Sequence, residues 1–190
     1  MIGRTIEEIA EGDAAELTRV VADEDVAGFI DAVGDDNPVH SDPAYAATTM
    51  FKAPIAPGLF TAGLISAVIG TKLPGPGAIY LSQTLTFTKP VFVGDTITAR
   101  VDVAAIVRDK NRLRLVTSCV NQRSEKVLAG EAWVMPSRTS IVYERPRGAL
   151  STMAGWTWSP WTIAARTMAA WSSLGLALMG GPATTSASRR

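Results

Sequence analysis

The chain contains only one cysteine and one histidine among its 190 residues. A single Cys119 excludes an intrachain disulfide, and one histidine with one cysteine cannot supply the ligand cluster of a zinc site. We therefore predict no metal site and no bound cofactor. Cys119 lies in a run of alternating polar and apolar residues, which favours a buried structural thiol over a nucleophile.

The chain also lacks an excess of charge, because Lys plus Arg and Asp plus Glu both number 18. A balanced chain has no overall attraction to nucleic acid or to an anionic membrane, so we expect neither as the main partner. Residues 1–11 are acidic and lack the apolar run of a secretory signal. These features together predict a cytoplasmic protein.

His40, the only imidazole, closes a six-residue sequence, DDNPVH, that begins at Asp35. Pro38 lies between the two and interrupts regular helix, so this stretch is predicted to be a turn or loop. Such a loop can aim an acid and an imidazole at one point in space, as the addition or removal of water requires. The alternative is that His40 is a loop histidine hydrogen-bonded to nearby backbone.

The pattern along the rest of the chain predicts two helices and a set of strands. A strand at 16–21 precedes a helix that starts at 22–25 and stops at Gly34. Residues 59–69 form a helix with almost no polar face, whose only hydroxyls are Thr61 and Ser66, so it should be buried on all sides. Alternating stretches at 78–89, 95–107, 111–122 and 126–135 follow as strands. This order predicts an α+β fold in which an antiparallel sheet wraps around the buried helix.

Four blocks of the sequence occur in the order found in a known family. They are GDDNPVHSDPAYA at 34–46, APIAPGL at 53–59, LPGPGAIYL at 73–81 and FTKPVFVGD at 87–95. Together they closely resemble the MaoC-like (R)-specific enoyl-CoA hydratases. The resemblance implies a hot-dog fold for a domain at 1–136. It also implies reversible syn addition of water to a trans-2-enoyl-CoA, which gives an (R)-3-hydroxyacyl-CoA.

The resemblance places the reaction on two side chains and one backbone amide. Asp35 and His40 map to the catalytic pair that holds the water, whereas the neighbouring Asp36 is outside the family spacing. Gly58 maps to the N–H group that binds the thioester oxygen, and its position at a helix N-terminus independently favours developing negative charge. Many relatives have histidine before this glycine, where this chain has Pro57.

Other positions map to supporting roles. Asn37 and Ser66 correspond to residues beside the catalytic pair, and Ile69 and Val134 to the wall of the acyl pocket. The Ser66 hydroxyl needs a partner in an apolar helix, either the active-site carboxylate or the carbonyl of Ala62 one turn earlier. The sequence leaves both partners open, and it does not distinguish a CoA thioester from an acyl-carrier-protein thioester.

The expected partners are an acyl-CoA substrate and a second copy of the chain. The strands at 78–135 end with no further element to cover the edges of their sheet, so we predict a homodimer with paired sheets.

The C-terminal third differs in composition from the rest. Residues 137–155 read as a linker, 156–181 as an apolar helix rich in tryptophan, and 182–190 as a disordered tail. For the helix we weigh an interfacial or partner-docking role, packing on the main domain, and a membrane span. It loosely resembles phasin-like segments that bind granules, which would suit an enzyme that is associated with a granule surface and supplies polyhydroxyalkanoate synthesis.

Two other functions compete with hydration. Hot-dog thioesterases generally use a carboxylate on or near the central helix, and residues 59–69 contain none. The second alternative is a non-enzymatic granule protein of the phasin type. Retention of Asp35, Asn37, His40, Gly58 and Ser66 together argues against a decayed active site.

Overall fold

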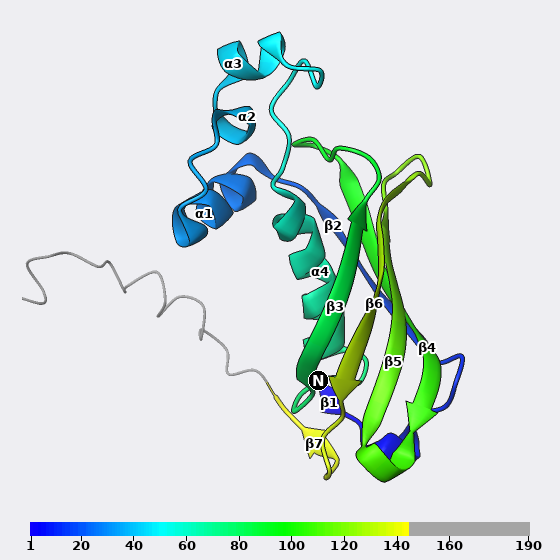
Figure 1. Ribbon diagram of the computed structural model, residues 1–190. Helices are drawn as coiled ribbons and strands as arrows, with labels where there is room; N and C mark the ends of the chain where they lie inside the picture. Colours follow the sequence, from blue (N-terminus) through cyan, green and yellow to red (C-terminus); the bar gives the residue numbers. More distant parts are fainter. Residues whose placement is uncertain (145–190) are drawn as a thin grey trace, which may run out of the picture. The chain divides into compact units, whose positions relative to one another are not determined.

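A five-stranded antiparallel sheet curves around one long helix in the computed structural model (Figure 1). The structure describes residues 1–144. The helix is α4 (Gly58–Thr71), and the strands follow the order β2-β4-β5-β6-β3 across the sheet. Their bounds are β2 Ala14–Val20, β3 Ile79–Phe87, β4 Thr96–Val107, β5 Arg112–Val120 and β6 Lys126–Met135. This arrangement confirms the predicted α+β hot-dog fold.

Alternation of side chains along the strands builds the core beneath the helix. On β5, Leu113, Leu115, Thr117 and Cys119 are buried, while the residues that alternate with them are partly or fully exposed. Leu115 is paired with Val103 of β4 and with Ala132 of β6, and all three side chains belong to the hydrophobic core. Because side chains of a strand alternate between its two faces, this register gives the sheet one apolar face for α4 to cover.

Helix α4 is buried on one face only, which corrects the prediction that it is buried on all sides. Leu64, Ile65 and Val68 lie in the core. The opposite face is exposed along its length and carries Leu59, Gly63, Ser66 and Gly70. The sequence has no polar stripe here because this face carries one leucine, two glycines and a single serine rather than charged residues, so hydrophobicity alone did not reveal it.

Three helices between β2 and α4 form a separate layer at one end of the sheet (Figure 1). They are α1 (Asp23–Val33), α2 (Pro38–Ser41) and α3 (Pro43–Thr48). Helix α1 ends as predicted at Gly34, which has a positive φ of 71° and donates its N–H to the carbonyl of Ile30. Helices α2 and α3 both begin with proline, a residue that suits the first helical position because its missing N–H has no helical partner there.

The remaining elements are short and tie the two ends of the described chain together. Strand β1 (Ile2–Gly3) pairs with β7 (Ile141–Val142), and 3-10 turns occur at η1 (Ile6–Glu8) and η2 (Arg108–Lys110). Strand β7 falls inside the predicted linker at 137–155, so the domain continues past residue 136. The rest of that linker, the predicted helix at 156–181 and the predicted tail at 182–190 lie outside the described residues. No helix within residues 1–144 is long and apolar enough to cross a membrane.

Candidate active site

Asp35 and His40 face each other across the turn between α1 and α2. His40 Nε2 lies 3.7 Å from the Oδ2 atom of Asp35, and the His40 side chain is only 10% exposed. This separation is too long for a direct hydrogen bond, but one water can lie within about 2.8 Å of both atoms. This spacing suits a water molecule held between a carboxylate and an imidazole.

Helix capping places these two side chains. Gly34 and Asp35 both donate their backbone N–H groups to the carbonyl of Ile30, which turns the chain sharply after α1. Asn37 is the N-cap of α2: its side chain accepts the N–H of Val39 at 3.2 Å, and its carbonyl accepts the N–H of His40 at 3.0 Å. His40 is thus on a short helix rather than in a loop, because Pro38 starts the helix that we expected it to prevent.

A backbone hydrogen bond fixes the orientation and the tautomer of His40. Its Nδ1 lies 2.7 Å from the carbonyl oxygen of Ile55, in the segment that leads into α4. A carbonyl can only accept, so Nδ1 carries the hydrogen and donates it. In the neutral imidazole the lone pair is then on Nε2, which faces Asp35. The backbone hydrogen bond that was the alternative for His40 is therefore present at Nδ1, and it leaves Nε2 facing Asp35 for the predicted catalytic role.

Gly58 begins α4 and lies against the ring of Phe87. Because Gly58 is the first residue of the helix, its N–H has no partner within the helix. A Cβ built at Gly58 would be 2.9 Å and 3.0 Å from two ring atoms of Phe87. The missing Cβ therefore lets the Phe87 ring pack against the start of α4, beside an amide that can bind a negatively charged oxygen.

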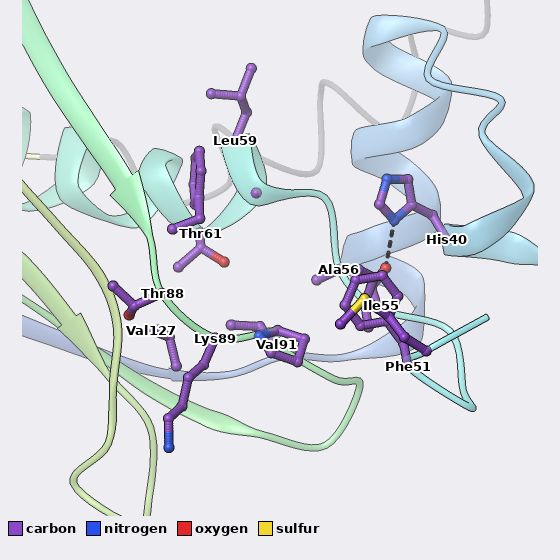
Figure 2. A pocket seen from close by; sticks show the side chains of 14 residues that line it. His40, Phe51, Ile55, Ala56, Leu59, Thr61, Thr88, Lys89, Val91 and Val127 are labelled. Carbon is purple, nitrogen blue, oxygen red and sulfur yellow. Dashed lines mark hydrogen bonds between the residues drawn. The ribbon is translucent and has the colours of Figure 1, made fainter.

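A cavity of about 510 Å³ joins His40 to the N-terminus of α4 (Figure 2). Most of its wall is apolar and comes from the loop before α4, the first turn of α4 and the connection from β3 to β4. The lining residues are His40, 50–51, 55–56, Gly58, Leu59, Thr61, 87–91 and Val127. Such a wall suits a long ligand that is largely apolar and has a few polar groups.

Among residues 1–144, Lys89 is the only Lys or Arg whose side chain lines the cavity, and its charge is paired with that of a neighbour. Its Nζ lies 2.5 Å from a carboxylate oxygen of Glu125. Hydrogen bonds from Asn121, Lys89 and Arg123 lower the pKa of Glu125 to about 2. The cavity wall is therefore polar at Lys89, where the positive charge of the lysine is paired with a carboxylate. This part of the wall lies away from His40 (Figure 2).

The structure does not bring every predicted site residue to this cavity. Ser66 is on the exposed face of α4, and its hydroxyl has no hydrogen bond to Asp35, to Ala62 or to any other described residue. Ile69 and Val134 are in the hydrophobic core and do not line the cavity. Apolar residues at such positions have the same sequence signature whether they line a pocket or fill a core.

Sequence reasoning missed Phe87, Lys89 and Thr61 as parts of the site. Phe87 and Lys89 lie within the FTKPVFVGD block, which was read as the end of a strand and as part of the family resemblance, but neither residue was assigned to the site. Thr61 was noted as one of two hydroxyls in an apolar helix, and the structure places it in the cavity wall.

Cys119 is confirmed as a structural thiol: it is fully buried, and burial raises its pKa to about 12.

Comparison with known proteins identifies the family. The MaoC-like domain model matches residues 6–126, which is more than half of the chain. This protein belongs to the MaoC-like family. A 3-hydroxybutyryl-CoA dehydratase from Methylorubrum extorquens is 47% identical over 128 residues, covering 67% of this chain and 81% of that protein. An (R)-specific enoyl-CoA hydratase from Rhodospirillum rubrum is 46% identical over 133 residues, covering 70% and 92%.

Solved structures of the family have the same fold. An unliganded R-hydratase from Pseudomonas aeruginosa is 43% identical and superposes with a TM-score of 0.71, covering 76% of this chain and 95% of that chain. The (R)-hydratase from Aeromonas caviae, described as involved in polyhydroxyalkanoate biosynthesis, is 43% identical with a TM-score of 0.66, covering 68% and 98%. Each of these four matches spans about two thirds or more of this chain and more than four fifths of the relative.

Proposed function

We propose that this protein catalyses the reversible syn hydration of a trans-2-enoyl thioester to an (R)-3-hydroxyacyl thioester. The observation that carries the proposal is the 3.7 Å separation of Asp35 Oδ2 and His40 Nε2, beside a cavity that His40 and Gly58 line. The family and the names of its hydratase and dehydratase relatives support the same reaction.

These groups match the charge and proton movements of the reaction. A base takes a proton from water as the water oxygen bonds to C3 of the substrate. The electron pair of the double bond moves onto the thioester oxygen, where the N–H of Gly58 stabilises the negative charge. The electron pair then returns as C2 takes a proton. Because Asp35 and His40 hold one water between them, both proton transfers occur on the same face of the substrate.

We propose coenzyme A as the thiol of the substrate. The two relatives at 46–47% identity bear CoA in their names, whereas a relative named as an acyl-carrier-protein dehydratase is 37% identical. The R-hydratase from Aeromonas caviae supports a role in supplying polyhydroxyalkanoate synthesis with (R)-3-hydroxyacyl units. A thioesterase is less well supported, because α4 carries no carboxylate.

We also propose that two copies form a homodimer through β3. This strand is one edge of the sheet, has nine residues without a charge, and exposes Ile79, Leu81 and Phe87. The opposite edge, β2, carries Glu16 and Arg19, and such charges discourage strand pairing. An uncharged edge of this length with exposed apolar side chains is a suitable surface for pairing with a second copy.

The test is hydration of crotonyl-CoA, followed by loss of the enoyl-thioester absorbance. Asp35→Asn and His40→Ala should each lower kcat by about 10²–10⁴-fold, the usual contribution of a general acid or base. The double variant should be little slower than either single variant, because both groups act on one water. Asp36→Asn, at an exposed carboxylate one residue away, should keep full activity.

The same assay separates the competing functions. A wild-type protein that releases free CoA from crotonyl-CoA without forming 3-hydroxybutyryl-CoA would favour the thioesterase. A protein that does neither would favour the non-enzymatic alternative. Full activity of His40→Ala would refute the proposed mechanism even if the wild-type protein is a hydratase.

A further inference from the structure

Thr61 presents a buried hydroxyl to the cavity. It lies in the first turn of α4, is 3% exposed, and belongs to the cavity wall. Figure 2 shows its side chain next to the start of α4, with the hydroxyl oxygen directed into the space between the lining residues. The side chains nearest to it in the wall are mainly apolar, which makes a hydroxyl at this depth unusual.

The Thr61 hydroxyl has no hydrogen-bond partner among the described residues. Two other threonines show what a satisfied hydroxyl does in this protein. Thr71, in the last turn of the same helix, donates to the carbonyl of Ala67 at 2.6 Å, and Thr88, in the cavity wall, donates to the carbonyl of Lys126 at 2.6 Å. Within residues 1–144 no completely enclosed side-chain oxygen or nitrogen lacks a partner, so the Thr61 hydroxyl is reached from the cavity.

Helix geometry directs this hydroxyl toward the region of the Gly58 amide. Thr61 follows Gly58 by three residues, and residues three apart lie on the same side of a helix. Side chains of a helix also lean toward its N-terminus, over the preceding turn. The hydroxyl of Thr61 and the N–H of Gly58 therefore approach the same part of the cavity, one from a side chain and one from the backbone.

We propose that Thr61 is a second donor to the thioester oxygen of the substrate. This inference rests on the proposed hydration reaction. When water adds to C3, the electron pair of the double bond moves onto the thioester oxygen, and the hydrogen bonds to that oxygen strengthen. Thr61 keeps its own proton throughout, so the two transferred protons still pass through the water site of Asp35 and His40. A donor that is already in place requires no reorganisation when the charge develops.

The test compares variants that remove or keep the hydroxyl, with crotonyl-CoA as the substrate. Thr61→Val keeps the shape of the side chain and should lower kcat by roughly 10²-fold with little change in KM, because the lost interaction is strongest in the transition state. Thr61→Ser keeps the donor and should retain most of the activity. Thr71→Val, the same substitution in the same helix but at a hydroxyl bonded to the backbone, is the matched control and should not change kcat.

Three results would overturn the inference. One is an unchanged kcat in Thr61→Val; another is a rise in KM alone, which would indicate contact with the substrate outside the reacting group. The third is an equal loss in Thr61→Ser and Thr61→Val at equal melting temperature. If Thr61→Val does not fold, Thr61→Ala removes the same hydroxyl and is judged by the same criteria. Activity of the wild-type protein tests the hydration proposal separately, so the two proposals fail in different measurements.

Discussion

Replacing Gly58 by alanine tests whether the start of α4 binds the thioester oxygen. The new methyl group would lie 2.9 Å and 3.0 Å from ring atoms of Phe87, closer than such carbon atoms normally approach. Phe87 is 50% exposed, so its ring can move toward solvent. The overpacking then lowers the free energy of unfolding by about 1 kcal/mol, at the low end of the usual range. Replacing glycine by alanine in a helix raises that free energy by about 0.5–1 kcal/mol, so the stability of the variant should hardly change.

The effect on catalysis should be much larger than the effect on stability. The methyl group would lie beside the Gly58 amide, in space that the Phe87 ring now fills, and would crowd a thioester oxygen that binds there. Losing one such donor lowers kcat by about 10²–10³-fold. The measurement is the kcat of crotonyl-CoA hydration, with thermal unfolding of the same samples. Gly28→Ala is the control: Gly28 lies on the exposed side of α1 with no atom near its added Cβ, so kcat should stay at the wild-type value.

A second substitution separates the two effects of the methyl group. In Gly58→Ala with Phe87→Leu the contact with the ring is removed, but the methyl group still blocks the amide. We expect this double variant to stay as slow as Gly58→Ala. A Gly58→Ala protein that folds normally and hydrates crotonyl-CoA within about threefold of wild type would refute the role of this amide, since loss of a true oxyanion donor costs far more.

Two further predictions concern the dimer and the response to acid. Leu81→Lys places a charge on the exposed edge strand β3 and should convert a dimer of the 20.1 kDa chain into a monomer by light scattering at micromolar concentration. Val116→Lys, at an exposed position of the interior strand β5, should leave the mass unchanged, and a wild-type monomer would refute the proposed pairing. The pKa of Glu125 is lowered from 4.5 to about 2, chiefly by Asn121, so its stabilising effect is complete above pH about 4.5 and is lost as pH falls toward 2. Glu125→Gln should flatten the pH dependence of unfolding in that window, and an unchanged profile would contradict this assignment.

Much of the fold follows from local sequence signals. The breaker residues around each strand and the αL glycine after α1 are local signals, and they predicted the bounds of these elements to within a few residues.

The region from Asp35 to His40 shows where local rules conflict. Pro38 disfavours helix for the residues before it, yet suits the first position of a helix that follows it. The capping side chain of Asn37 decides in favour of α2, and this signal was available in the sequence.

The geometry of the site depends on contacts that sequence spacing does not contain. The hydrogen bond from His40 to Ile55 joins residues that are fifteen positions apart, and it sets which ring nitrogen faces Asp35. The contact between Gly58 and Phe87 joins α4 to the far end of β3. Family resemblance can name the residues that take part, but only the folded chain shows which atoms of those residues face one another.

The position of Ser66 and the exposed edge of β3 have a common physical interpretation. The apolar character of residues 59–69 predicted burial on all sides, and the single chain buries only the face that contacts the sheet. Its other face carries small residues, and small residues allow close approach of another surface without a polar penalty. Strand β3 is likewise uncharged and has no covering element within the described residues. If the proposed dimer forms, part of this apolar surface becomes buried, and the sequence then reflects burial in the assembled protein. Ser66 would be tested best in that state, by comparing Ser66→Ala with wild type in a sample shown to be dimeric.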